Sequence, residues 1–226
     1  MARLVPDLSI SSVVTTSQCP IRFYLEKENK KKESWRYAIA KQISYHLGSA
    51  LDEDEIWGEV CLVQKDMEGS AKSFFTESVH ICRNNPAWRN YREADLMVQS
   101  ARFHIHGVID KLFDGEPSFS IIRPSLAPSK GIYTADRIRI TGYCICLEEM
   151  FDMPVESGCI EYIPSGTERV CTVQPIDKRR FLRALYEARR IQQGEVPKKP
   201  LNPPCRYCPQ NDRCDLKEGT RLSDLI

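Results

Sequence analysis

The sequence predicts an α/β protein in which helices flank a mixed β-sheet. Hydrophobic periodicity indicates a helix, two strands, a second helix, two more strands and a third helix, in that order along the chain. Interspersed helices and strands of this kind are typical of a sheet with helices packed against it. The chain has 226 residues, which is enough for one well-buried domain and a small appendage.

The first predicted helix covers residues 32–47. Its apolar positions recur at steps of three and four residues, at Trp35, Ile39, Ile43 and His46. Gly48 follows as a C-terminal stop. His46 is therefore expected to point inward. Residues 49–101 show no clear pattern and remain without assigned elements.

A β-hairpin is predicted next. Residues 102–113 alternate as a strand does, Asp114 and Gly115 supply the turn, and residues 118–123 form the return strand, which Pro124 ends. A second helix is expected from Ala135 to Asp152, followed by short strands at 159–163 and 170–173.

The third helix is expected to begin at a cap formed by Asp177 and to end at Gly194. Its apolar stripe consists of Phe181, Leu185, Ala188 and Ile191. A proline-rich linker, 197–204, then leads to a cluster of cysteines. These features divide the chain into an N-terminal segment (1–30), a core (31–195) and a C-terminal cysteine module (196–226).

Composition excludes some classes of protein. The formal net charge is +1, with 42% hydrophobic and 28% charged residues, so any nucleic-acid site must be local. No apolar run approaches the length of a membrane span, and the first residues do not read as an export signal. Ten cysteines without a signal peptide indicate a reducing compartment, and we expect a cytoplasmic protein.

Four cysteines predict an inorganic centre. Cys205, Cys208 and Cys214 form a C-x2-C-x5-C cluster near the C-terminus, and Cys19 lies in a Gln-Cys-Pro segment near the N-terminus. Three thiolates in one loop can converge on a metal, and a tetrahedral site or a cubane needs a fourth. The other six cysteines lie singly or in apolar surroundings, so Cys19 is the natural fourth ligand. Such a centre would join the two ends of the chain.

Three interpretations of these cysteines remain open. The x5 spacing and the distant fourth ligand favour an iron–sulfur cluster, while C-x2-C also occurs in zinc sites, and the third interpretation is that no metal binds. A disulfide framework is disfavoured because the chain does not look like a short secreted domain.

The order of motifs resembles a known nuclease family. It comprises Cys19, His46 on a helix, Gly107-Val-Ile-Asp110, an Ala127-Pro128 loop, the motif 136–143 on the second predicted helix with Tyr143 as its last residue, and the C-terminal cysteines. This pattern is similar to the RecB-like CRISPR-associated exonucleases, the family of the fourth Cas protein, in the PD-(D/E)XK nuclease superfamily. The resemblance covers nearly the whole chain and is weakest over 49–101. It implies a restriction-endonuclease-like fold and a four-iron, four-sulfur cluster.

The resemblance also implies a chemistry. His46 and Asp110 match metal ligands, and Tyr143 matches the family's helix tyrosine. In such sites carboxylates and a histidine hold manganese or magnesium, which lowers the pKa of a bound water, while a lysine orients that water.

Three positions depart from the family's pattern. Ile121 stands where the family has the glutamate of its E-x-K motif, Arg123 stands for the lysine, and Arg139 for a helix glutamine. Isoleucine cannot ligate a metal, and arginine keeps its proton and has a planar, bulkier head group. We therefore expect Asp110, Tyr143, Arg123 and Arg139 to form an altered site with weak or absent cleavage. Glu116, Glu148 and Glu149 do not replace the missing acid convincingly.

Ordinary structural roles explain the same residues. His46 and Tyr143 could simply pack in the core, and Asp110 could simply stabilise the hairpin. The basic residues Lys178–Arg180 and Arg183 could form an ordinary solvent-exposed helix face.

The resemblance implies a protein that acts on single-stranded DNA ends during CRISPR spacer acquisition, with integrase-type proteins as candidate partners. The alternative is an inactive iron–sulfur paralogue that binds DNA or a protein partner. No membrane association is expected, and homo-oligomerisation stays open.

Overall fold

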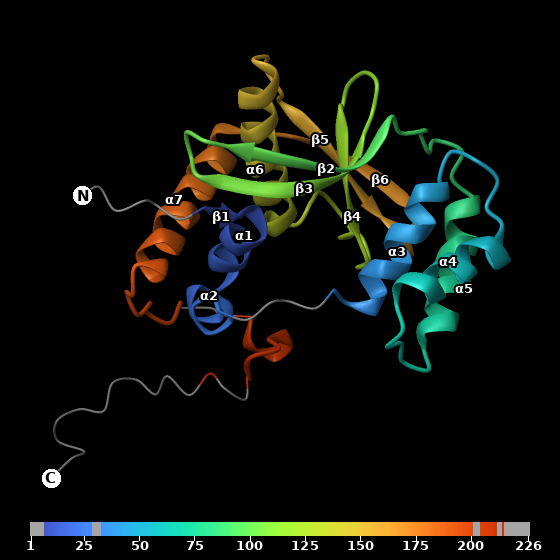
Figure 1. Ribbon diagram of the computed structural model, residues 1–226, viewed down its shortest axis with the longest axis horizontal. Helices are drawn as coiled ribbons and strands as arrows, with labels where there is room; N and C mark the ends of the chain where they lie inside the picture. Colours follow the sequence, from blue (N-terminus) through green and yellow to red (C-terminus); the bar gives the residue numbers. More distant parts are fainter. Residues whose placement is uncertain (1–6, 29–32, 201–203, 212–213, 215–226) are drawn as a thin grey trace, which may run out of the picture.

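The computed structural model describes residues 7–28, 33–200, 204–211 and 214. It is a mixed α/β fold with an open, mixed sheet flanked by helices, as predicted (Figure 1). No helix in the described part of the chain has the length and apolar character needed to span a bilayer.

The elements follow one another in this order: β1 (Leu8–Ser9), α1 (Ile10–Gln18), α2 (Pro20–Glu26), α3 (Trp35–His46), α4 (Glu53–Val63), α5 (Ala71–Arg83), β2 (Glu93–Ser100), β3 (Ile105–Leu112), β4 (Phe119–Arg123), α6 (Thr134–Phe151), β5 (Ser157–Tyr162), η1 (Ile163–Ser165), β6 (Thr167–Thr172), α7 (Pro175–Gln192) and η2 (Cys205–Tyr207).

The sheet forks along one edge of β3. Strand β2 pairs with β3 in antiparallel fashion from Ile105 to Leu112, so β1 and β4 share the opposite edge of β3. At one end of this edge β1 pairs in parallel with Ile105 and His106; at the other end β4 pairs with Lys111 and Leu112. Within the described structure, residues 107–110 have no strand partner on this edge, and a fork opens there.

Two hydrophobic cores cover the two faces of the sheet, because side chains alternate along each strand. Ile121 of β4 packs into the core that β2 and β3 share with α1, α6 and α7. Its neighbour Ile122 packs into a second core made with α3, α4 and α5. Figure 1 shows α3, α4 and α5 beside β4 and β6, away from the long β2–β3 ribbon.

Two glycines allow α1 to pack closely against β3 and α6. A Cβ atom on Gly107 would lie 2.8 Å from Tyr143 Cε1 and 3.2 Å from Ile10 Cδ1. One on Gly142 would lie 2.7 Å from Phe181 and 3.1 Å from Ile10 Cγ2. A larger residue at either position would push α1 or Tyr143 out of place. The N-terminal segment thus contributes a strand and a helix to the main core.

The predicted first helix is confirmed as α3, which begins at Trp35 after an N-cap by Ser34 and ends at His46. The unassigned region 49–101 contains α4, α5 and β2. Helix α4 has only two buried residues, Ile56 and Val60, so its apolar face is too narrow to show as a periodic pattern.

The hairpin, the second helix and the later strands were also predicted, as β3, β4, α6, β5 and β6. The cap of the third helix was wrong. Helix α7 begins at Pro175, its N-cap is Gln174, and Asp177 is the third helical residue of a capping box. Asp177 was misread because its carboxylate bonds backward to the Gln174 N–H, at 3.0 Å, and the helix starts before it. The buried stripe of α7 contains all four predicted residues.

Candidate functional site

A cavity of about 430 Å³ occupies the fork between β1 and β4. It is lined by Ser9, Ser11, Tyr37, His106, Gly107, Val108, Asp110, Ile121, Ile122, Arg123, Arg139 and Tyr143. The fold thus brings together the four residues predicted to be catalytic: Asp110, Tyr143, Arg123 and Arg139.

Asp110 lies at the base of the fork, where both carboxylate oxygens already accept hydrogen bonds. Oδ1 accepts from the Tyr37 hydroxyl of α3, and Oδ2 accepts from the Ile122 N–H at 2.8 Å. Burial raises the pKa of Asp110, and the two hydrogen bonds oppose that shift. The carboxylate therefore fastens α3 and β4 to β3. Its burial disfavours the anion that a divalent cation would need.

Arg123 turns toward α6. Its Nε lies 3.0 Å from Oδ1 of Asp136, a buried residue whose other oxygen accepts from the Tyr162 hydroxyl at 2.9 Å. Asp136 is thus a second carboxylate beside the fork, on the helix and not on β4. Asp136 belongs to the motif 136–143 but was not predicted as a site residue. It lies three residues before Arg139 and seven before Tyr143, and this spacing, which places the three residues on one face of a helix, could have indicated it.

Arg139 faces the cavity differently. Its Nη1 donates to Ser11 Oγ at 3.0 Å, and its Nε is buried without a hydrogen-bond partner. Among the described residues, no carboxylate lies within 4 Å of its guanidinium. Burial raises the pKa of Tyr143 to about 12, and the positive charge of Arg139 opposes that rise. Arg139 is the cation of this cavity without an acidic partner.

His46 does not join this cavity. It is the last residue of α3, and its Nε2 lies 2.9 Å from Glu59 Oε2 of α4. Tyr37, nine residues earlier on α3, is the residue that reaches Asp110. Nine residues span about 13 Å along a helix axis, so one straight helix cannot bring both side chains to Asp110. In this structure, the expected His46–Asp110 pair is replaced by Tyr37–Asp110.

A buried ion pair lies on the α3 side of the sheet and was missed in the sequence. Lys111 Nζ is 3.1 Å from Glu161 Oε2, and both side chains are at most 2% exposed. Glu161 also accepts hydrogen bonds from Ser44 of α3 and Ser120 of β4. Burial lowers the pKa of Lys111, while Glu161 opposes that shift. Since these partners come from four elements, no local spacing could reveal them.

The acids considered as replacements for the missing glutamate lie outside the cavity. Glu149 accepts hydrogen bonds from Ser100 and the Arg102 N–H, and Glu148 pairs with Lys178 at 3.9 Å. Glu116 accepts from Ser157 at 3.3 Å.

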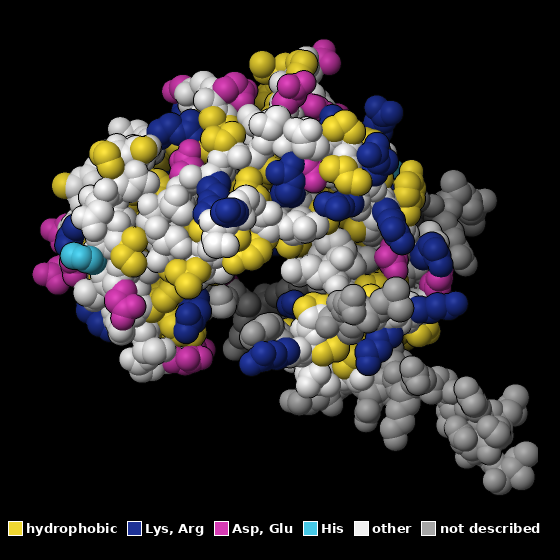
Figure 2. Space-filling model, turned by 180° about the vertical axis from the view of Figure 1, so that it is seen from behind, with side chains coloured by type: hydrophobic (Ala, Val, Ile, Leu, Met, Phe, Trp, Pro, Cys, Tyr) yellow, Lys and Arg dark blue, Asp and Glu magenta, His cyan; other side chains and the backbone are white. Residues whose placement is uncertain are grey.

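The basic residues of the first half of α7 are solvent-exposed, whereas Arg189 near its end is half-buried and donates a hydrogen bond to the Phe103 carbonyl. Lys178, Arg179, Arg180 and Arg183 all lie on its exposed face. Figure 2 shows Lys and Arg side chains along the side of the molecule that α7 occupies.

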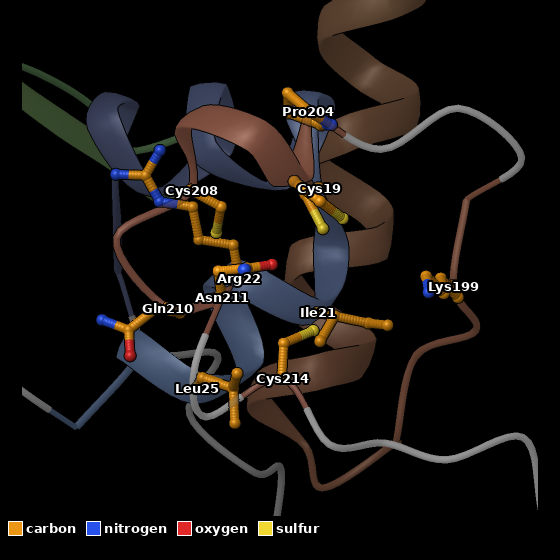
Figure 3. A pocket seen from close by; sticks show the side chains of 11 residues that line it. Cys19, Ile21, Arg22, Leu25, Lys199, Pro204, Cys208, Gln210, Asn211 and Cys214 are labelled. Carbon is orange, nitrogen blue, oxygen red and sulfur yellow. The ribbon is translucent and has the colours of Figure 1, made fainter.

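The four predicted ligand cysteines share a second pocket. Cys19, at the end of α1, and Cys205, Cys208 and Cys214 line it together with apolar atoms and the side chains of Arg22 and Lys199. Figure 3 shows Cys19, Cys208 and Cys214 pointing into this pocket from the two ends of the chain. The pKa of the Cys214 thiol is raised, first by burial and then by Cys19, Cys205 and Cys208. The four cysteines thus lie around one pocket.

Four cysteine thiols in an apolar pocket are a donor set that suits an iron–sulfur cluster and equally suits zinc. Among the described residues, no three His, Cys, Asp or Glu side chains form a group placed to hold a metal ion. The thiols therefore share a pocket without the close arrangement of a single-ion site.

Comparison of the sequence with protein-family models gave no match, and a search of curated proteins gave none either.

Proposed function

We propose that this protein binds single-stranded DNA ends through the fork cavity, as a relative of the RecB-like CRISPR-associated exonucleases with weak or lost cleavage. The observation that carries the proposal is Arg139. Its guanidinium opens onto the cavity without an acidic partner, whereas both oxygens of Asp110 already accept hydrogen bonds. A site whose guanidinium has no acidic partner among the described residues, and whose carboxylate is already hydrogen-bonded, favours a phosphate over a divalent cation.

Ile121 and Arg123 support the loss of cleavage. Ile121 is 1% exposed and presents no ligand atom, and Arg123 neutralises Asp136, the second carboxylate beside the fork. Metal-dependent hydrolysis needs an ion that both activates water and offsets the developing charge. Each group that would hold that ion is absent or already engaged.

The restriction-endonuclease-like fold is part of this proposal. It is supported by the forked sheet, with Asp110 at the fork, Arg123 on the neighbouring strand, and Arg139 and Tyr143 on the following helix.

The cysteine pocket supports a cofactor, for which we propose a four-iron, four-sulfur cluster held by Cys19, Cys205, Cys208 and Cys214. Such a cluster would supply iron–thiolate bonds between the two ends of the chain. With these bonds, the C-terminal segment would be held against the end of α1, whose first turn lines the DNA-binding cavity.

A metal-dependent exonuclease is the second candidate, and Asp136 favours it. If Arg123 left Asp136, two carboxylates would flank the fork. Manganese-dependent cleavage of labelled single-stranded DNA by the unmodified protein, abolished by Asp110→Ala, would establish this candidate and refute the loss of cleavage.

The test of binding uses fluorescence anisotropy with a labelled single-stranded oligonucleotide. Arg139→Ala should weaken binding about tenfold or more, since a charge-assisted hydrogen bond contributes about 1.5–3 kcal/mol. Arg123→Ala should weaken it less, because Asp136 already neutralises Arg123. Affinity should fall with salt, with a log–log slope that Arg139→Ala reduces by about 0.7. Chelators should have no effect.

Arg83→Ala is the matched control, because Arg83 of α5 pairs with Glu53 outside the cavity. Equal affinities and salt slopes for the unmodified protein and Arg139→Ala would refute the proposal. Integrase-type partners belong to the same proposal and can be tested by co-purification with the Arg139→Ala protein as control.

A further inference from the structure

The face of the β2–β3 ribbon that turns away from α1 and α6 is open. Met97 on β2 and Val108 on β3 are register partners, and they are 71% and 42% exposed. Gln99 and His106, the next pair on this face, are also exposed. The intervening pair, Val98 and Gly107, turns to the opposite face, where Val98 is buried. We name Met97, Gln99, His106 and Val108 the open face.

The open face and the arginine cavity are continuous. Val108 and His106 line the same cavity as Arg139 and Ser11, so one wall of the cavity runs outward as the open face. The helices α3, α4 and α5 cover the α3 side of the sheet around β4 and β6, and α3 reaches the β2–β3 ribbon only at Asp95 of β2 and Asp110 of β3 among the described residues. The side chains of Met97, Gln99, His106 and Val108 lie beyond these contacts and are exposed.

The chemistry of the open face complements the bases of a single strand. Its four side chains include no carboxylate, ammonium or guanidinium group: two are apolar, one is an amide and one is an imidazole. Apolar and imidazole side chains can lie against the flat faces of bases, and an amide can hydrogen-bond their edges. Arg139 in the adjoining cavity, which has no acidic partner among the residues that the structure describes, complements a phosphate. A nucleic-acid single strand presents these two chemistries side by side.

We propose that the open face contacts the bases of single-stranded DNA whose phosphate lies at Arg139. This inference rests on the proposed function and adds a surface that contacts the bases of the bound strand. The free edge of β2 suggests a second copy of the chain as a competing occupant, since edge strands pair readily. The continuity with Arg139 favours the nucleic acid, because strand pairing would use the backbone edge of β2 and would not need the cavity.

The test compares two labelled probes of equal length, an oligothymidine and an abasic oligonucleotide with the same phosphates. The unmodified protein should bind oligothymidine more tightly. Met97→Ala with Val108→Ala should weaken oligothymidine binding about fivefold, the lower range for the loss of one base contact. It should leave abasic binding and the salt slope unchanged, because no phosphate contact is removed.

Leu62→Ala with Val63→Ala is the matched control, because these residues are 80% and 58% exposed at the end of α4, outside the cavity. This pair should bind both probes as the unmodified protein does. All the substituted side chains are exposed, so the variants should fold, which circular dichroism checks.

The outcomes separate this inference from the proposed function. Equal affinity for both probes, with Arg139 still required, overturns the base contacts and leaves phosphate binding intact. No binding of either probe overturns both. A dimer of the unmodified protein that excludes oligothymidine identifies a second copy as the occupant and overturns the inference.

Discussion

The buried pair of Lys111 and Glu161 should be one of the most sensitive points of the fold. Lys111→Met leaves Glu161 with only the hydroxyls of Ser44 and Ser120 as donors, and Glu161→Leu leaves a buried ammonium without its carboxylate. Removing one member of a buried ion pair costs about 3–5 kcal/mol. That is a large fraction of the roughly 5–15 kcal/mol by which domains are stable. Each single variant should therefore be severely destabilised.

The double variant distinguishes an unpaired charge from lost packing. Lys111→Met with Glu161→Leu removes both charges, so its cost should be at most about 2 kcal/mol, from the two hydroxyls that lose their acceptor. Urea unfolding followed by tryptophan fluorescence measures all three free energies of unfolding. Arg83→Met, in an exposed ion pair, is the control and should lose less than about 1 kcal/mol.

The reasoning is refuted if either single variant loses less than about 1 kcal/mol, or if the double variant loses the sum of the two singles. Strict additivity would mean that the two charges do not stabilise one another. The result also bears on the cavity, because Ser44 lies seven residues after Tyr37 on α3, and the network helps to hold Tyr37 over Asp110.

Three further predictions concern the two sites. Cys19→Ser should remove iron, sulfide and violet absorption from anaerobically purified protein and lower its thermal midpoint. Cys61→Ser, at an exposed cysteine, is the control and should leave the iron content, the absorption and the thermal midpoint unchanged. Stoichiometric zinc without iron would contradict the cluster. Ile121→Glu with Arg123→Lys should lower the free energy of unfolding by about 1–3 kcal/mol, because it buries a carboxylate at a position that is 1% exposed. Manganese should restore part of the lost stability in a thermal-shift assay. Absence of a manganese response would contradict a latent metal site. Because the folded state raises the pKa of Asp110, its contribution to stability is fully present below pH 3.8 and is lost as the pH rises through the folded pKa. The stability of Asp110→Asn relative to the unmodified protein should therefore improve with rising pH in that window, and a pH-independent difference in urea unfolding would contradict the shift.

The sequence predicted α3, the β3–β4 hairpin, α6, β5, β6 and α7 because their signals are local, and it missed β1, α1, α2, α4, α5 and β2. The period of Trp35, Ile39 and Ile43 indicated α3, and Asp114-Gly115 marked the hairpin turn, since a helical stripe or a turn pair needs no knowledge of the rest of the chain. Helix α4 lacked such a signal, because it buries only Ile56 and Val60. Helix α5 carried one in the stripe Ala71, Phe75, Val79 and Cys82, which was missed in the sequence. The apolar faces of both helices pack mainly on α3, η1 and one another, and not on a long strand.

The candidate site was predictable only in part. Asp110, Arg123, Arg139 and Tyr143 could be named from their motifs, and they share one cavity. Tyr37 and Asp136 could not, because each acts through a partner that lies far away in the sequence: Tyr37 on Asp110, and Asp136 on Arg123 and Tyr162. The placement of His46 failed for a geometric reason, since the position of a residue on a helix face does not say which end of the helix meets the strand.

By itself, the sequence determined the α/β class, the hairpin, the three confirmed helices and the two groups of residues for which sites are proposed. Only the tertiary structure decided what those groups face. It paired Arg123 with Asp136, left Arg139 open to the cavity, and turned both oxygens of Asp110 toward hydrogen-bond donors. The physical reason is that periodicity and turn chemistry act over a few residues, whereas charge pairing and burial depend on which distant segments the fold brings within a few ångströms.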